Sequence, residues 1–165
     1  MKKISRQIVD CLSEGGTIFA CGNGGSASQA DHFVAELVCS FENRNRPPLR
    51  AISLNSNTAI LTAWANDFTF DDVFARQIEA LMVNGDILVI FSTSGKSINC
   101  QQAHQYAHDK GCEVIEFPRK GNGTAQIQEN QLKEMHQVCR EVEKEMCSQS
   151  IRSQGPMSYK DLIIG

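Results

Sequence analysis

Four short, continuous apolar segments alternate along the chain with longer segments of helical spacing. The apolar segments are Thr17–Cys21, Leu49–Leu54, Asp86–Phe91 and Cys112–Ile115. Strands that are covered on both faces of a sheet have unbroken apolar sequences of this kind. The helical segments cover residues 27–41, 58–81 and 97–110, and a last helix follows the fourth strand. This βαβαβαβα order predicts an α/β fold: a three-layer, doubly wound parallel sheet with right-handed crossovers.

The composition limits the class of protein. A chain of 165 residues, 41% hydrophobic and 21% charged, is large enough for one globular domain. We assign residues 1–146 to this domain and residues 147–165, which have little periodicity, to a C-terminal tail. The net charge of −3 gives no reason to expect nucleic acid or an anionic membrane as a partner, and no apolar run approaches the roughly 18 residues of a membrane span. Seven cysteines without a CxxC pair are expected to be reduced thiols, and the N-terminus is not a signal peptide, which predicts a cytoplasmic protein.

The loop after the first predicted strand is rich in glycine. It runs Gly22-Asn23-Gly24-Gly25-Ser26 and leads directly into a helical segment. Ligands of open α/β sheets bind beyond the carboxyl ends of the strands. There, glycines let the backbone approach a ligand, and a helix N-terminus presents free N–H groups. Taken alone, however, this loop favours a tight strand-to-helix turn with a serine cap.

The loop after the third predicted strand is rich in hydroxyl groups. Its sequence, Ser92-Thr93-Ser94-Gly95-Lys96-Ser97, contains more hydroxyls than one helix N-cap requires. Clustered hydroxyls, backbone N–H groups and a helix N-terminus can hold a phosphate without a metal. Neither loop contains a Walker A or GxGxxG motif, so we expect no nucleotide cofactor. The two loops together predict a pocket for a small sugar phosphate.

Helical spacing also brings two titratable side chains together near the first loop. His32 and Glu36 are four residues apart and therefore lie on one side of a helix. Phe33 and Leu37 mark the side that faces the core, so His32 and Glu36 are expected near its boundary. On spacing alone, a solvated pair is the better interpretation.

Two further sets of polar side chains share a helix side. Gln128 and His136 lie two turns apart on the last helix, where a polar stripe is the simpler interpretation. His104 and His108 are also four residues apart. They lie far from the N-terminus of their helix, and we expect them at the surface rather than at a metal.

These motifs together resemble the SIS (sugar isomerase) domain, and within it the phosphoheptose isomerase, or sedoheptulose-7-phosphate isomerase, family. The resemblance runs in order from about residue 15 to residue 146. It is carried by CGNGGS at 21–26, HFVAEL at 32–37, NDF at 66–68, VFARQIEAL at 73–81, STSGKS at 92–97, TAQIQE at 124–129 and His136. The STSGKS loop marks the wider fold, whereas Glu36 with Gln128 and His136 points to this isomerase.

The resemblance implies a flavodoxin-like sheet, a homotetramer with sites at subunit interfaces, and an aldose–ketose isomerisation of sedoheptulose 7-phosphate for heptose and lipopolysaccharide or surface-glycan biosynthesis. It implies Glu36 as the base and His136 as the acid. The phosphate ligands that it implies are Ser92, Thr93, Ser94 and Ser97. The residues that it places along the sugar are Asn23, Gly24, Gly25, Asn66, Asp67 and Gln128. A zinc ion, which members of the family can bind, would be held by His32, Glu36, Gln128 and His136.

The chain departs from the family pattern at three places. Only eleven residues separate Ile115 from Ile127, about twenty fewer than is usual, so a fifth strand is not expected and the position of the last helix is open. Ser40 stands where the family usually has arginine, and the helix before the first strand is short. Two alternatives to an enzyme are a binding module of the same fold, of the type that binds a replication initiator, and a sugar-phosphate sensor.

Overall fold

The computed structural model describes the backbone of residues 3–154 and the side chains of residues 3–148. Strands and helices alternate along it in the predicted order, with one helix before the first strand. The elements are α1 (Lys3–Ser13), β1 (Ile18–Gly22), α2 (Gly25–Val38), β2 (Ala51–Ser53), α3 (Thr58–Asp67), the 3-10 helix η1 (Phe70–Asp72), α4 (Val73–Leu81), β3 (Ile87–Phe91), α5 (Ile98–Asp109), β4 (Glu113–Glu116) and α6 (Thr124–Gln154).

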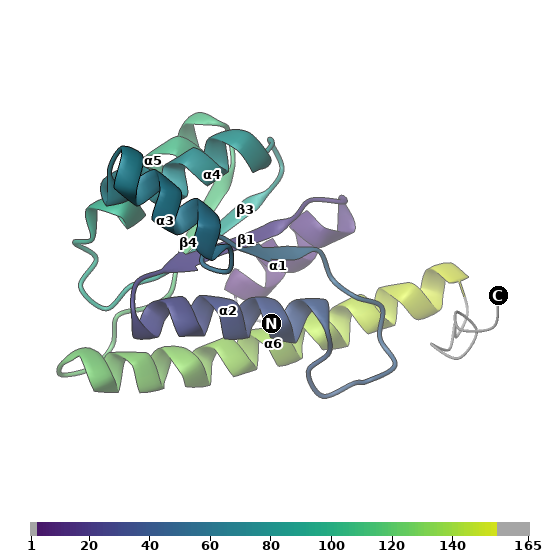
Figure 1. Cartoon of the computed structure of the whole chain (residues 1–165). Coiled ribbons are helices and arrows are strands. Elements are labelled where there is room, and N and C mark those ends of the chain that lie inside the picture. Colours follow the sequence, from purple (N-terminus) through teal and green to yellow (C-terminus); the bar gives the residue numbers. More distant parts are fainter. Residues whose placement is uncertain (1–2, 155–165) are drawn as a thin grey trace.

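The four strands form one parallel sheet in the order β2-β1-β3-β4. Helices α1, α2 and α6 cover one face, and α4 and α5 cover the other, with α3 further out (Figure 1). The predicted three-layer, doubly wound architecture is therefore confirmed. After β1 the chain continues to β2, which pairs with one edge of β1, and then returns to β3, which pairs with the opposite edge of β1. Such a reversal opens a crevice at the carboxyl ends of the two central strands, where ligands of these folds bind.

Two apolar clusters hold the layers together, one on each face of the sheet. Phe33 and Leu37 of α2 are fully buried in the first cluster, beside Phe91 and Phe117. This arrangement confirms the predicted core side of α2. The second cluster joins the opposite side chains of β1 and β3 to α4 and α5. Because successive side chains of a strand point to opposite faces, the continuous apolar strands supply both clusters at once.

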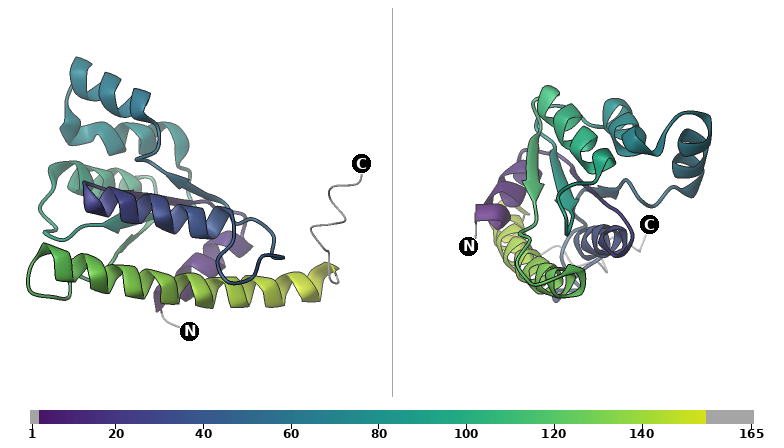
Figure 2. Two further views of the ribbon diagram at one scale, coloured as in Figure 1. Left: turned by 60° about the horizontal axis from the view of Figure 1, so that its bottom comes forward. Right: turned by 90° about the vertical axis from the view of Figure 1, so that its left-hand side faces the viewer.

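Helix α6 lies along α1 and α2 and crosses the lower face of the sheet (Figure 2). One side of α6 carries an apolar stripe at helical spacing that is buried in the core. Its residues are Ile127, Met135, Val138 and Val142. Residues 117–123 lead directly from β4 into α6, and the described part of the chain contains no fifth strand. The predicted boundary at residue 146 falls within α6, which continues to Gln154. Residues 155–165 of the predicted tail lie outside the described residues.

Helix α3 stands apart from the layers (Figure 2). None of its residues is buried, although its sequence, TAILTAWAND, is largely apolar. The rings of Trp64 and Phe68 stack with centroids 4.3 Å apart, and Phe68 is 68% exposed. With Ile60 and Phe70, also exposed, these residues form what we call the α3 surface. Among the helices of the described residues, none has both the length and the apolar character needed to cross a membrane.

Candidate active site

The glycine-rich loop turns sharply from β1 into α2. A methyl group at Gly22 would lie 2.6 Å from the carbonyl oxygen of Ser26 and 2.8 Å from that of Phe91, so only glycine fits there. Gly24 has a φ of 56°, in the left-handed region that favours glycine. No side chain caps the N-terminus of α2. The N–H groups of Ser26 and Ala27 donate to the carbonyls of Asn23 and Gly24 at 3.0 Å, which leaves those of Gly24 and Gly25 for an anion at the carboxyl end of β1.

The hydroxyl-rich loop closes on itself through its own serines. The Gly95 N–H donates to Ser92 Oγ at 2.9 Å, and the Lys96 N–H donates to Ser94 Oγ at 3.1 Å. Gly95 has a φ of 66°. Ser97 occupies the N-cap position of α5 without making a side-chain capping bond. The first turn of α5 thus keeps N–H groups for a ligand, and the loop geometry fits the predicted phosphate cradle.

The two loops are joined by an amide pair that sequence reasoning missed. Asn23 Nδ2 donates to Asn99 Oδ1 at 2.8 Å, and Asn99 Nδ2 donates back to Asn23 Oδ1 at 2.9 Å. Asn55 clasps the backbone of Gly22 in the same way, accepting from its N–H at 3.1 Å and donating to its carbonyl at 2.8 Å. Asn23, expected to line the sugar, therefore also sets the spacing between the loops.

Three titratable side chains meet where α2 passes α6. His32 Nε2 and Glu36 Oε1 are 2.8 Å apart, with the two side chains 41% and 19% exposed. The His136 ring meets the His32 ring edge-on at 5.2 Å between centroids. One ligand atom from each of the three residues lies within 4.8 Å of the others. The structure therefore brings together the predicted base, the predicted acid and the additional histidine.

These three residues fit a zinc ion by type and by spacing. Zinc in proteins favours imidazole nitrogen and carboxylate oxygen at about 2.0–2.2 Å, and catalytic sites keep three protein ligands and an open position. Donor atoms within 4.8 Å of one another need only small side-chain movements to reach such distances. Gln128, the fourth predicted ligand, lies two turns before His136, about 12 Å along the helix axis. Its amide packs on Gly25 instead, beside the glycine-rich loop.

A second glutamine of α6 holds the hydroxyl-rich loop. Gln131 is 1% exposed, and its Nε2 donates to the carbonyl of Ser92 at 3.1 Å and to that of Phe117 at 3.3 Å. The sequence contained a signal for this residue, because Gln131 interrupts the apolar stripe between Ile127 and Met135. A polar side chain at a core position usually has a buried partner.

Two predicted sugar-lining residues lie away from this group. Asn66 and Asp67 are at the end of α3, where Asn66 Nδ2 donates to Asp67 Oδ1 at 2.8 Å and both side chains are exposed. Helix α3 packs mainly on η1 and α4, on the other face of the sheet from α2 and α6. Within one chain, the structure therefore does not bring these residues to the three titratable side chains.

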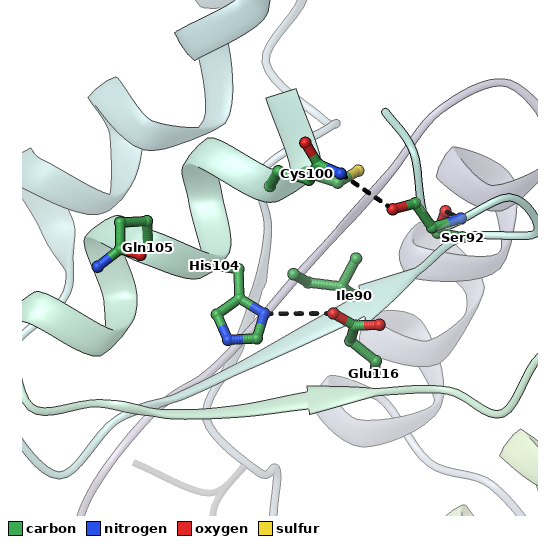
Figure 3. A pocket seen from close by; sticks show the side chains of 8 residues that line it. Ile90, Ser92, Cys100, His104, Gln105 and Glu116 are labelled. Atoms are coloured by element: carbon green, nitrogen blue, oxygen red, sulfur yellow. Dashed lines mark hydrogen bonds and ion pairs between the residues drawn. The ribbon is translucent and has the colours of Figure 1, made fainter. Parts of the chain in front are cut away.

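A hollow of about 140 Å³ lies between α5 and β4, next to the hydroxyl-rich loop (Figure 3). His104 Nδ1 and Glu116 Oε1 face each other across it at 3.2 Å. The hydrogen bond from Arg119 holds the pKa of the Glu116 carboxyl below its usual range. His108 is exposed, as predicted, and His104 is half-exposed. The Glu116 carboxylate is therefore paired within the chain, with Arg119 Nη1 at 2.6 Å from Oε2 and the His104 ring against Oε1.

Known proteins resemble this chain in sequence and in structure. The family model described as the SIS domain matches residues 1–117. A phosphoheptose isomerase from Methylibium petroleiphilum is 40% identical over 158 residues, which cover 84% of this chain and 78% of that protein. One from Thiobacillus denitrificans is 42% identical over 154 residues, which cover 82% and 78%.

Solved structures agree with the sequence matches. A phosphoheptose isomerase from Francisella tularensis superimposes with a TM-score of 0.81 at 33% identity, and one from Neisseria gonorrhoeae with 0.79 at 35%. Each superposition covers 86% of this chain and 83% of the other. The chain therefore belongs to the SIS domain family and, within it, to the phosphoheptose isomerases. Helix α6, which carries His136, lies beyond the part that the SIS domain model matches.

Proposed function

We propose that this protein is an aldose–ketose isomerase that interconverts sedoheptulose 7-phosphate and D-glycero-D-manno-heptose 7-phosphate. The observation that carries the proposal is the meeting of Glu36 and His136 from two different helices, in a chain of the phosphoheptose isomerase family that also has two loops suited to an anion. A binding module or a sugar-phosphate sensor of this fold would have no need for such a pair, and the relatives do not favour either alternative.

The phosphate group would bind at the hydroxyl-rich loop. Ser94 and Ser97 offer side-chain hydroxyls at the N-terminus of α5, and Thr93 and Ser92 are the other two predicted ligands. Hydrogen bonds to a charged group, together with the positive end of the helix dipole, hold a dianion without a metal. The sugar would extend from there over Asn23, Gly24 and Gly25 toward Gln128.

The isomerisation requires a base for a carbon-bound proton and a group that serves the oxygens. Glu36 would remove the proton beside the carbonyl and return it to the neighbouring carbon, through an enediol. His136 would donate a proton to the carbonyl oxygen and take one from the hydroxyl. General acid–base catalysis typically raises the reaction rate by about 10² to 10⁴-fold. Asn66 and Asp67 would reach such a site only from a neighbouring subunit.

Zinc is an optional part of the proposal: a bound ion would be held by His32, Glu36 and His136, with Gln128 reaching it only after a change of side-chain position, and it would occupy donor atoms that otherwise transfer protons. Bound zinc polarises a carbonyl as a Lewis acid. One ion per subunit is expected, measured as metal content after purification and after treatment with a chelator.

The α3 surface supports the proposal of a homotetramer. Leu61 and Trp64 are partly buried against the second apolar cluster, whereas Ile60, Phe68 and Phe70 are exposed, and exposed apolar side chains that gather in this way are suited to contact with another chain. Closed symmetric assemblies are the usual form of soluble homo-oligomers. Sedimentation of a monomer at micromolar concentration would contradict the interface site. We also propose that the protein is cytoplasmic, because seven free thiols are stable in that compartment. Its role would be to supply heptose for lipopolysaccharide or surface glycans.

One assay tests the central claim. Purified protein is incubated with sedoheptulose 7-phosphate, and the aldose product is followed with and without chelator, against Glu36→Gln as the matched control. Turnover that disappears in Glu36→Gln is expected. Absence of turnover in the unmodified protein, with and without added zinc, would refute the assignment.

A further inference from the structure

The imidazole of His136 is covered by an aromatic side chain from the loop between α2 and β2. The ring of Phe41 stacks on it with centroids 5.5 Å apart and an angle of 21° between the planes. His32 meets the same imidazole edge-on. The orientation of the His136 ring is therefore determined by two aromatic neighbours, one against its face and one at its edge.

Glu143 holds the loop that carries Phe41. Its carboxylate accepts from the backbone N–H groups of Phe41 at 3.1 Å, of Glu42 at 2.9 Å and of Asn43 at 2.9 Å. Glu143 is only 5% exposed. Burial alone would raise the pKa of this carboxyl, but the Phe41 amide, Arg46 and the two other amides together hold the pKa below its usual range. The loop is thus fixed to α6, two turns beyond His136.

Arg46 connects the same carboxylate to the helix that carries the proposed base. Its side chain is 1% exposed, and its Nε donates to Glu143 Oε1 at 2.8 Å. Another guanidinium nitrogen, Nη2, donates to the backbone carbonyl of Glu36, and Nη1 donates to that of Pro47 at 2.9 Å. A buried ion pair whose donors and acceptors are satisfied constrains geometry closely. Arg46 therefore links the end of α2 to α6.

We propose that Phe41, held by Glu143 and Arg46, is a positioning residue that fixes the imidazole of His136 relative to Glu36. The terminal torsion of a histidine side chain is broad, so an uncovered ring would turn away from one productive orientation. The inference rests on the proposed function for its effect on turnover. The placement of the ring, however, can be tested without any substrate.

The first test is spectroscopic. The chain contains four histidines, so imidazoles labelled with ¹³C at Cε1 give four signals, and His136→Asn identifies one of them. In the full chain, with chelator present and at one fixed pH, Phe41→Leu should move the His136 signal because the stacked ring no longer shields it. Phe41→Tyr should leave it in place, and the His104 and His108 signals should not move. An unchanged His136 signal in Phe41→Leu would overturn the proposal.

The second test is kinetic. Phe41→Leu should lower kcat on the order of 10- to 100-fold, as is usual when a reactive group loses its support. KM should change little, because Phe41 lies away from the phosphate loop. Phe41→Tyr should restore kcat, whereas a role in packing alone would be met equally well by leucine. Equal kcat values for Phe41→Leu and the unmodified protein would also overturn the proposal.

Variants of the ion pair keep the proposal testable if Phe41→Leu does not fold. Glu143→Gln preserves size and should move the same His136 signal, because the loop loses its charged anchor. Glu79→Gln, which breaks the exposed Arg76–Glu79 pair, is the matched control and should leave kcat and the signal unchanged. If the unmodified protein does not turn over sedoheptulose 7-phosphate, the proposed function fails. The Glu143→Gln signal then still decides the placement, because this variant keeps the Phe41 ring and moves the His136 signal only if the anchored loop sets how the two rings lie.

Discussion

Gly25 begins helix α2 beneath the amide of Gln128, and a methyl group at this position would lie 2.5 Å from Gln128 Nε2. The neighbour is the far end of a side chain that can swing away, so the collision is relieved by moving Gln128. Replacing glycine by alanine in a helix interior gains about 0.5–1 kcal/mol, and a smaller gain is expected at Gly25 because it is the first residue of α2. We therefore expect Gly25→Ala to be as stable as the unmodified protein or slightly more stable, with Gln128 displaced from the loop.

Gly22→Ala provides the structural contrast. Its methyl group would meet two backbone carbonyl oxygens at 2.6 and 2.8 Å, and neither can move without the strand or the helix that carries it. Forcing extra volume into a packed region costs about 1–3 kcal/mol. For a chain of this size the melting temperature falls by about 2–4 °C for each kcal/mol. Thermal melts should thus separate the two substitutions clearly.

The functional assay is a double-mutant cycle in kcat/KM. If the Gln128 amide contacts the sugar through a neutral hydrogen bond worth about 0.5–1.5 kcal/mol, Gly25→Ala and Gln128→Ala should each lower kcat/KM by roughly 2- to 10-fold. Because both remove the same contact, the double variant should lose no more than either single one. Additive losses would mean that the new methyl group blocks the substrate directly. Full activity in Gly25→Ala would refute the role of Gln128.

Three other predictions follow from the site. Ser94→Ala and Ser97→Ala should each raise KM, since a hydrogen bond to a charged phosphate is worth roughly 1.5–3 kcal/mol; an unchanged KM in both would place the phosphate elsewhere. Glu36→Gln and His136→Asn should lower kcat by about 10² to 10⁴-fold with little loss of binding, and a loss at Glu36 alone would assign the acid to another group. The lowered pKa of Glu143 means that its stabilisation is complete above the ordinary carboxyl pKa and is lost as pH falls through the folded value. Urea unfolding should therefore show a smaller decrease in stability below about pH 4.3 in Glu143→Gln than in the unmodified protein.

The parts of the fold that could be predicted from sequence are those fixed by local patterns. The central strands β1 and β3 are unbroken apolar runs with every residue buried, because helices cover both of their faces. The edge strands β2 and β4 have exposed positions, among them Ile52 and both glutamates of β4, so their short apolar centres were the signal that made them visible. The two loops were visible for a similar reason. A tight turn after a strand needs glycines, and the start of a helix favours hydroxyl side chains. Each of these signals is contained in a few consecutive residues, so it can be read from the sequence alone.

The contacts that hold the candidate site together could not be predicted in this way. Arg46 and Glu143 are 97 positions apart in the sequence, and Asn23 and Asn99 are 76 positions apart. The sequence does not distinguish a buried arginine from an exposed one. The partner of Arg46 depends on how the loop after α2 packs against α6. The pairing of His32 with Glu36 illustrates the same limit. Spacing predicted the pair correctly, but its meeting with His136 depends on how α6 lies.

The short connection between β4 and α6 shows what does position that helix. If a fifth strand followed β4, that strand and its crossover connection would determine how the chain returns to the face of the sheet that α2 covers. Here the stripe from Ile127 to Val142 packs on α1 and α2, and Gln131 and Glu143 attach the helix to the hydroxyl-rich loop and to the loop of Phe41. The apolar stripe sets the rotation of α6 about its axis, and the polar anchors set its position along that axis. Together they place His136 beside Glu36 although the described part of the chain has no fifth strand, so the proposed acid–base pair depends on these contacts of α6 rather than on a further strand.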